Sequence, residues 1–181
     1  MTQVRVRIDE GASPQPILLW DSVWNPGEGC ADWAIASAGE GLNRGGLQAT
    51  SALATAVTNA LFTNRRCPDD HPLRYLAGDD LQGWWGDGID VRADLGEQPE
   101  GSLLWLLERA PLTRDIVERW APTFVQDALA PLVGQGAVVR IETDVVANEL
   151  TSRLEIYVRL FGRDGSKIFD ARFDAVWLQL R

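Results

Sequence analysis

The sequence predicts an α+β fold in which helices pack on one face of an antiparallel C-terminal β-meander. Apolar residues alternate with charged ones through three segments after residue 137, and they recur at spacings of three and four between residues 50 and 134. The apolar face of a half-buried sheet and the apolar stripes of amphipathic helices must both be buried, and packing the helices on the sheet buries both. A chain of 181 residues suits one domain with a sizeable core, and we expect a single domain over residues 1–181.

We expect this domain to have three parts, which are an irregular Trp- and Gly-rich segment (1–46), a helical and loop region (47–134) and the β-meander (137–180). The first part begins with an alternating strand at Val4–Ile8 and has a short apolar run at Ile17–Trp20, with a turn at Gly11–Pro14 between them. From Asp21 to Gly46 glycines are frequent and no period is sustained. We predict an irregular segment there, pinned by Trp24 and Trp33.

The second part opens with a predicted helix over about residues 50–62, capped by Thr50 or Ser51. Its apolar positions recur at helical spacing and are Leu53, Ala56, Val57, Ala60 and Leu61. Prolines and glycines then interrupt every pattern from Thr63 to Gly101. We predict a long ordered loop, of the kind that usually carries function.

Two further helices follow the loop. Ser102 is predicted to cap a short buried helix over Leu103–Glu108, which is apolar nearly all round. Thr113 opens a longer helix with one apolar stripe, and Pro122 either kinks that helix or starts a second one. We assign Trp105 and Trp120 to the core.

The third part is the meander. Its first strand alternates Val139, Ile141 and Val145 with charged residues, and its second repeats the pattern over Leu154–Leu160. Asp164-Gly165 supplies a hairpin turn before the third strand, whose alternating apolar residues are Phe169, Ala171, Phe173, Ala175 and Trp177. Such a meander leaves an edge strand to which a partner could add a strand.

Composition and charge exclude several classes of function. The net charge of −9 opposes the phosphate neutralisation that nucleic-acid binding requires. Apolar runs are too short for a membrane span, and Thr2–Ile8 lacks the apolar stretch of a secretory signal, so we expect a cytosolic chain. Cys30, Cys67 and the single His71 are too few for a disulfide scaffold or a metal site. We therefore expect no metal, cofactor, nucleic acid or membrane partner.

The segment Gly83-Trp84-Trp85-Gly86-Asp87 is the most informative stretch of the chain. Adjacent side chains diverge in both strands and helices, so one regular element cannot bury both indoles. Either both rings fold back over the core, or at least one is a rigid anchor for a partner surface.

Acidic residues of the loop offer an enzymatic alternative. The pairs Asp69-Asp70, Asp79-Asp80 and Asp87 with Asp90 could in principle supply the two carboxylates of a peptidoglycan-cleaving glycosidase, with tryptophans stacking on sugar rings. Adjacent loop acids are usually only solvated, and nothing in the sequence fixes their separation. We find no nucleophile elbow or phosphate-binding loop, and we predict no catalytic residue.

Three motifs, taken in order, resemble a known family. They are Leu61-Phe62-Thr63-Asn64-Arg65-Arg66, then Gly83–Asp87, then Gly101–Leu107. In this order and spacing they resemble the small baseplate proteins of Mu-like contractile-tailed phages. A more distant similarity links the chain to the lysozyme-like wedge subunit of larger phages and to its type VI secretion counterpart.

The resemblance implies a structural protein in each wedge of a six-fold baseplate, near the tail tube and the first sheath ring. It implies other wedge proteins, and sheath or tube proteins, as partners, with assembly in the host bacterial cytoplasm and a final place in the virion tail. The distant relatives carry Glu-Pro-Arg where this chain has Gln135-Gly136-Ala137, and Asn64 replaces an acid common in the nearer family.

We predict that an interface includes Arg65, Arg66, Trp84, Trp85 and Asp87. The alternative is that the two arginines are only a solvated helix end, favoured by the helix dipole. The rival functions are the glycosidase described above and a stand-alone module that binds a host protein.

Overall fold

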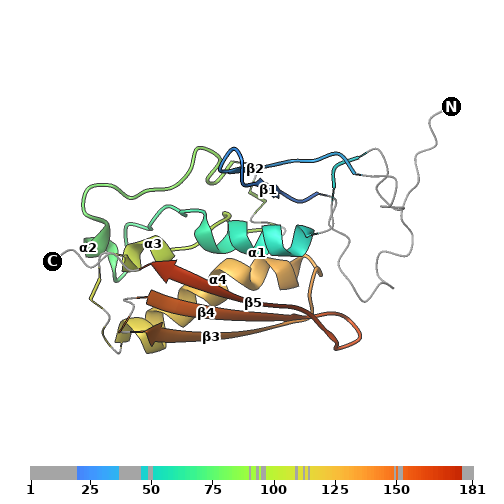
Figure 1. Ribbon diagram of the computed structural model, residues 1–181. Helices are drawn as coiled ribbons and strands as arrows, with labels where there is room; N and C mark the ends of the chain where they lie inside the picture. Colours follow the sequence, from blue (N-terminus) through green and yellow to red (C-terminus); the bar gives the residue numbers. More distant parts are fainter. Residues whose placement is uncertain are drawn as a thin grey trace.

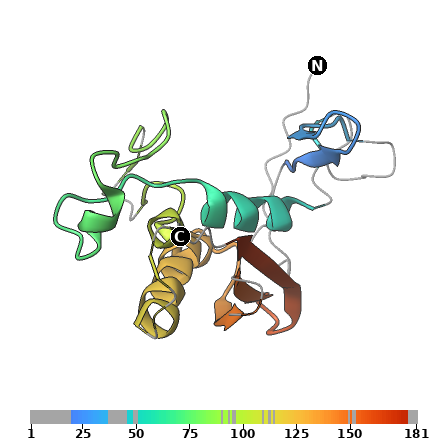
Figure 2. The same ribbon diagram turned by 60° about the vertical axis from the view of Figure 1, so that its left-hand side comes forward.

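The computed structural model describes residues 20–36, 46–48, 51–89, 91–92, 94, 97–108, 110–111, 113, 115–148, 150 and 153–176. In chain order the elements are β1 (Val23–Asn25), β2 (Cys30–Asp32), α1 (Ala52–Phe62), α2 (Arg74–Ala77), α3 (Leu104–Leu107), η2 (Ile116–Trp120), α4 (Ala121–Gly134), β3 (Arg140–Asn148), β4 (Arg153–Phe161) and β5 (Lys167–Val176). Figures 1 and 2 show α4 along one face of the β3–β4–β5 sheet, with α1 beside it. The predicted α+β fold is confirmed.

The C-terminal sheet is antiparallel with β4 at its centre. Ile156 of β4 lies opposite Val145 of β3 and Phe173 of β5. Alternate β4 side chains are fully buried, namely Leu154, Ile156, Val158 and Leu160. This period of two is the one seen in the sequence, and one side of the strand therefore forms the floor of the core.

The turn between β4 and β5 lies where the sequence places it. Gly165 has φ +77°, a conformation that glycine adopts without a Cβ clash, and Ser166 N–H bonds to Asp164 Oδ1. The first strand begins one residue later than predicted, because Val139 precedes β3 and is half exposed. The predicted strand at Val4–Ile8, its following turn and Trp177 lie outside the described residues.

We predicted an irregular segment after Asp21. The structure instead forms the β1–β2 hairpin there. Val23 pairs with Asp32 and Asn25 with Cys30, around a turn over residues 26–29. The hairpin joins the N-terminus of α1, where Asp21 Oδ2 accepts a 2.6 Å hydrogen bond from Ser51 N. Ser51 itself makes no side-chain cap bond, so a buried carboxylate distant in sequence takes the predicted role of this serine.

Pro122 separates two helical geometries. Ala121 N–H bonds to Ile116 O, five residues back, which is the π-helical pattern of η2. Pro122 then lies in the first turn of α4, where its missing N–H costs little. The backbone stays helical through Trp120 and Ala121, so Pro122 follows a change of helical geometry within one continuous run and does not start a separate helix. Thr113 Oγ1 accepts a bond from Ile116 N at the start of η2.

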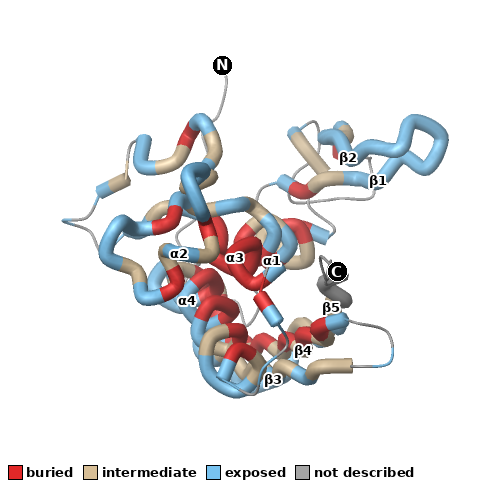
Figure 3. The backbone as a smooth tube through the Cα atoms, turned by 90° about the vertical axis from the view of Figure 1, so that its left-hand side faces the viewer, coloured by how far each residue is buried: buried red, intermediate tan, exposed pale blue. Residues whose placement is uncertain are grey.

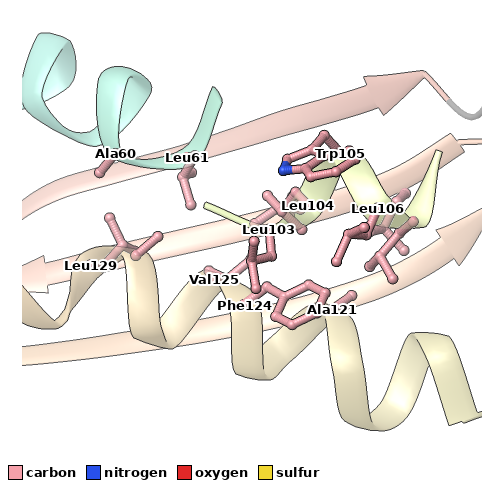
Figure 4. Packing of buried hydrophobic residues seen from close by; sticks show 14 of the residues in the cluster. Ala60, Leu61, Leu103, Leu104, Trp105, Leu106, Ala121, Phe124, Val125 and Leu129 are labelled. Carbon is pink, nitrogen blue, oxygen red and sulfur yellow. The ribbon is translucent and has the colours of Figure 1, made fainter. Parts of the chain in front are cut away.

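The core lies between the sheet and the helices, and Figure 3 shows burial concentrated along their facing sides. Figure 4 shows Leu61 of α1, Trp105 of α3 and Phe124 of α4 turned into this space. Trp105 is buried, as predicted. Trp120 is only half-buried at the core margin, because its indole N–H donates to the exposed Asp115 Oδ2. It still packs against the core and against the ring of Phe124, so its assignment to the core is confirmed only in part.

Candidate functional site

The candidate site is the loop after α1, which the core holds at two points. A bridge joins Asn64 to Ser102, and Arg65 N–H donates to Ser102 O at 3.0 Å. Ser102 Oγ donates to Leu61 O at 2.5 Å and accepts a 3.2 Å bond from Leu104 N. The serine therefore ties the end of α1 to the start of α3, although the N-cap of α3 is Leu103 rather than the predicted Ser102.

Trp105 holds the backbone of Arg65 through a hydrogen bond from the core side of the loop. Its indole Nε1 donates to Arg65 O at 2.9 Å, so a buried ring reaches out of the core to the loop. Gly101 permits the close approach of the two chain segments, because a Cβ there would lie 2.4 Å from Thr63 O. The backbone that carries Arg65 is therefore rigid although its side chain is half exposed.

Arg66 is joined to the tryptophan motif by its backbone. Its N–H donates to Asp87 Oδ2 at 2.8 Å. Gly83 lies between the two residues with φ +104°, and a Cβ on it would be 3.1 Å from Asp87 Oδ2 and 3.2 Å from Arg66 Cβ. A larger residue would separate the two segments, so Gly83 is required for both conformation and space. Asn64, in the position of the family acid, donates to Gln82 Oε1.

The two indoles of the motif have different environments. Trp84 is half-buried with its ring over Gly86, and its indole N–H is enclosed without a hydrogen-bond partner. Trp85 is 88% exposed and meets the ring of Trp84 edge-on, with centroids 5.5 Å apart. Bonds from Asp87 N to Trp84 O and from Ile89 N to Gly86 O close the turn. The turn is thus preorganised, and it displays Trp85 to solvent.

A shallow depression of about 430 Å³ connects these parts. Its lining residues are Arg65, Arg66, Cys67, Pro68, Asp69, Asp87, Gly88 and Pro99. Within the described part of the chain, neither Arg65 nor Arg66 forms a side-chain ion pair. The structure therefore brings three of the five predicted interface residues around one depression, with Trp84 and Trp85 on the adjoining turn.

Two titratable groups record the local electrostatics. Burial raises the pKa of the Cys67 thiol above 9.0, although Arg74 and Arg66 act in the opposite direction. Burial and the positive charge of Arg65 lower the pKa of His71 below 6.5. Both groups therefore favour their neutral forms at pH 7.

Two of the acidic loop residues, Asp80 and Asp87, accept hydrogen bonds from backbone N–H groups. Asp80 Oδ1 accepts a bond from Gln82 N, and Asp87 holds the N–H of Arg66 as described above. Asp79 is exposed, and Asp90 lies outside the described residues. Among the residues the structure describes, no group of three or more His, Cys, Asp or Glu side chains could hold a metal ion. No helix in that same part is long and apolar enough to cross a membrane.

Sequence reasoning missed an exposed aromatic group on the β1–β2 hairpin, where Trp24 and Trp33 are 62% and 63% exposed. The available signal was that both tryptophans flank a Pro-Gly turn at positions that share one side of a two-stranded ribbon.

The fold and the site define a small α+β protein with a rigid loop that presents an exposed indole beside Arg65 and Arg66, whose guanidinium groups form no ion pair with another described residue. Comparison with known proteins gives its family. The model of the phage protein GP46 family matches residues 53–167, from α1 into the meander. The chain is 40% identical over 129 residues to baseplate protein gp46 of Escherichia phage Mu. The aligned region covers 69% of this chain and 82% of that relative. No solved structure matches.

The chain therefore belongs to the phage protein GP46 family, and the resemblance to the small baseplate proteins of Mu-like phages is confirmed. The matched span contains all five predicted interface residues, and the β1–β2 hairpin precedes it.

Proposed function

We propose that this chain is a structural component of a phage tail baseplate and that neighbouring baseplate proteins hold it through the loop surface formed by Arg65, Arg66, Trp84, Trp85 and Asp87. The similarity to the Mu baseplate protein supports the role, and the exposure of Trp85 on a preorganised turn supports the surface. The finer proposal is a wedge position in a contractile tail, next to the tube and the first sheath ring. The chain assembles there from the host cytoplasm as one domain.

The loop surface has the physical properties of an interface centre. A tryptophan buries roughly 150–250 Å² when a partner covers it, and such residues dominate binding energy at interfaces. The bonds from Arg66 N to Asp87 and from Asp87 N to Trp84 O exist before a partner arrives, so little loop entropy is lost on binding. The guanidinium groups of Arg65 and Arg66 then supply oriented donors for a partner carboxylate or carbonyl.

Complementation of a phage or prophage that lacks this gene tests the proposal. Trp85→Ala removes the exposed ring, and Arg66→Ala removes one guanidinium of the loop surface. Tyr75→Ala is the matched control, because Tyr75 is 73% exposed on α2 of the same loop region but lies outside the proposed surface.

We expect Trp85→Ala to reduce the yield of complete tails by about tenfold or more, which corresponds to about 1.4 kcal/mol of lost contact. Tyr75→Ala should give the wild-type yield, and all variants should keep wild-type far-ultraviolet circular dichroism. Normal tails from both Trp85→Ala and Arg66→Ala would remove this surface from the interface.

A further inference from the structure

The β1–β2 hairpin carries a second exposed apolar surface, which we call the hairpin patch and define as Trp20, Trp24, Trp33 and Ile35. Their exposed fractions are 41%, 62%, 63% and 79%. Isolated exposed apolar residues are ordinary, but a cluster with three indoles on one short hairpin marks an interaction site. Figure 2 shows the hairpin at one end of α1 and the loop that follows α1 at the other.

Trp24 and Trp33 of the hairpin patch lie on one side of the ribbon. Trp24 pairs with Ala31, and Trp33 follows two residues later along the same strand direction, so alternation places the two indoles on the same side. Trp20 meets Trp33 edge-on, with ring centroids 6.0 Å apart. Trp20 and Trp33 are therefore in contact, and Trp24 lies on the same side of the ribbon as Trp33.

The core holds this surface in place. Asp21 N–H donates to Gln48 O, and Asp21 Oδ2 accepts from Ser51 N at the start of α1. Ser22 N–H donates to Thr55 Oγ1 at 3.1 Å, and Thr55 is buried. A short hairpin alone is marginally stable, so these bonds to α1 are what present the indoles in a fixed arrangement.

Charge selects the occupant. The segment from Trp20 to Ala36 contains Asp21, Glu28 and Asp32 and has no lysine or arginine. Glu28 and Asp32 are exposed on the same hairpin, whereas Asp21 is buried at α1. Indole faces attract guanidinium and ammonium groups, and the negative charge of the same hairpin adds to that attraction. The same carboxylates repel an anionic membrane surface.

We infer that the hairpin patch docks an arginine- or lysine-bearing segment of a neighbouring baseplate protein, and this inference rests on the proposed function. The patch precedes the span that the family model matches, so it is a surface additional to the loop surface. The chain then contacts its neighbours at two ends of α1, with aromatic and cationic groups at one end and aromatic and anionic groups at the other.

Photo-crosslinking inside assembled tails tests the inference. Trp24 is replaced by benzoylphenylalanine, tails are purified and irradiated, and the joined peptides are sequenced by mass spectrometry. Leu150, which is 99% exposed, receives the same probe as the control position. We expect Trp24 to cross-link to a segment of another tail protein with an arginine or lysine within about five residues of the joined site, well above the yield at Leu150.

Charge variants supply the second arm. The double variant Glu28→Lys/Asp32→Lys should lower tail yield by about tenfold or more, since two attractions become repulsions, and Glu28→Gln/Asp32→Asn should lower it by less. A joined peptide without basic residues, a cross-link to lipid, to peptidoglycan or to this chain itself, or equal yields from both charge variants and wild type would overturn the inference. Absence of the wild-type chain from tails would overturn the proposed function as well, whereas its presence without a cross-link at Trp24 sinks this inference alone.

Discussion

Replacing Gly86 by alanine should displace Trp84 and disorder the turn that displays Trp85. A Cβ on Gly86 would lie 2.2 Å from Trp84 Cζ3 and 2.3 Å from Cη2. Carbon atoms in contact prefer about 3.5–4.0 Å, so the ring must move by more than about 1 Å. Because Gly86 does not have a positive φ, the effect of this substitution is steric.

The expected loss of stability is about 1–3 kcal/mol, the usual cost of forcing one extra methyl group into a packed site. For a chain of this size that lowers Tm by roughly 2–12 °C. Gly134→Ala is the matched control, because its Cβ would meet nothing within 4 Å at the end of α4. Alanine there should leave stability unchanged or raise it by up to about 1 kcal/mol.

Thermal unfolding and the Trp84 indole N–H resonance measure the two effects together. Gly86→Ala should lower Tm and shift that resonance, while Gly134→Ala changes neither in that direction. Wild-type stability and an unmoved Trp84 resonance in Gly86→Ala would show that the ring does not lie over Gly86, and the account of a preorganised turn would be wrong.

Other parts of the structure give further predictions. Ser102→Ala should lower the free energy of unfolding by about 1–3 kcal/mol, because Leu61 O and Leu104 N lose their shared partner; an unchanged urea midpoint would contradict those bonds. The folded-state pKa of His71 is below 6.5, so the stability contributed by neutral His71 is full above pH 6.5 and is lost as pH falls through that lower value. An NMR titration of this single histidine at or above 6.5 would refute the assignment. Exposed Cys30 should react with iodoacetamide long before buried Cys67, whose pKa is raised, and equal rates would contradict that burial. The purified chain should not clear a peptidoglycan suspension, and clearing that disappears in Asp87→Asn would restore the glycosidase alternative.

The C-terminal sheet could be predicted because its signal is local. Leu154, Ile156, Val158 and Leu160 alternate with polar residues, and the structure buries all four completely. The helix over α1 was equally readable from its spacing of three and four. In both cases one buried face dictates the pattern, so propensity and packing agree.

The errors arose where distant residues decide the structure. Asp21 caps α1 from 30 positions away, a contact with no local signal, and the short strands β1 and β2 are too brief to show a period. The predicted long loop from Thr63 to Gly101 also contains the short helix α2. Trp120 was assigned to the core by its stripe, but its indole N–H needs a partner and finds Asp115 at the surface.

The loop surface was predicted in membership but not in detail. The motif required that the two indoles diverge, and the structure has Trp84 over Gly86 with Trp85 outward. Which ring faces out depends on the space left by the missing Cβ of Gly86, and that space exists only after the loop closes on Arg66 through Asp87. That five-residue interface stays a prediction until assembly is measured.

Quantitative mass spectrometry of density-purified tails from an induced lysogen carrying this gene tests the central claim most directly. The account predicts a fixed, low ratio of this chain to the sheath protein that survives washing in high salt, because aromatic burial at the loop surface is not screened by ions. Absence of the chain from intact tails, or its loss on the first wash, would contradict a structural role in the baseplate.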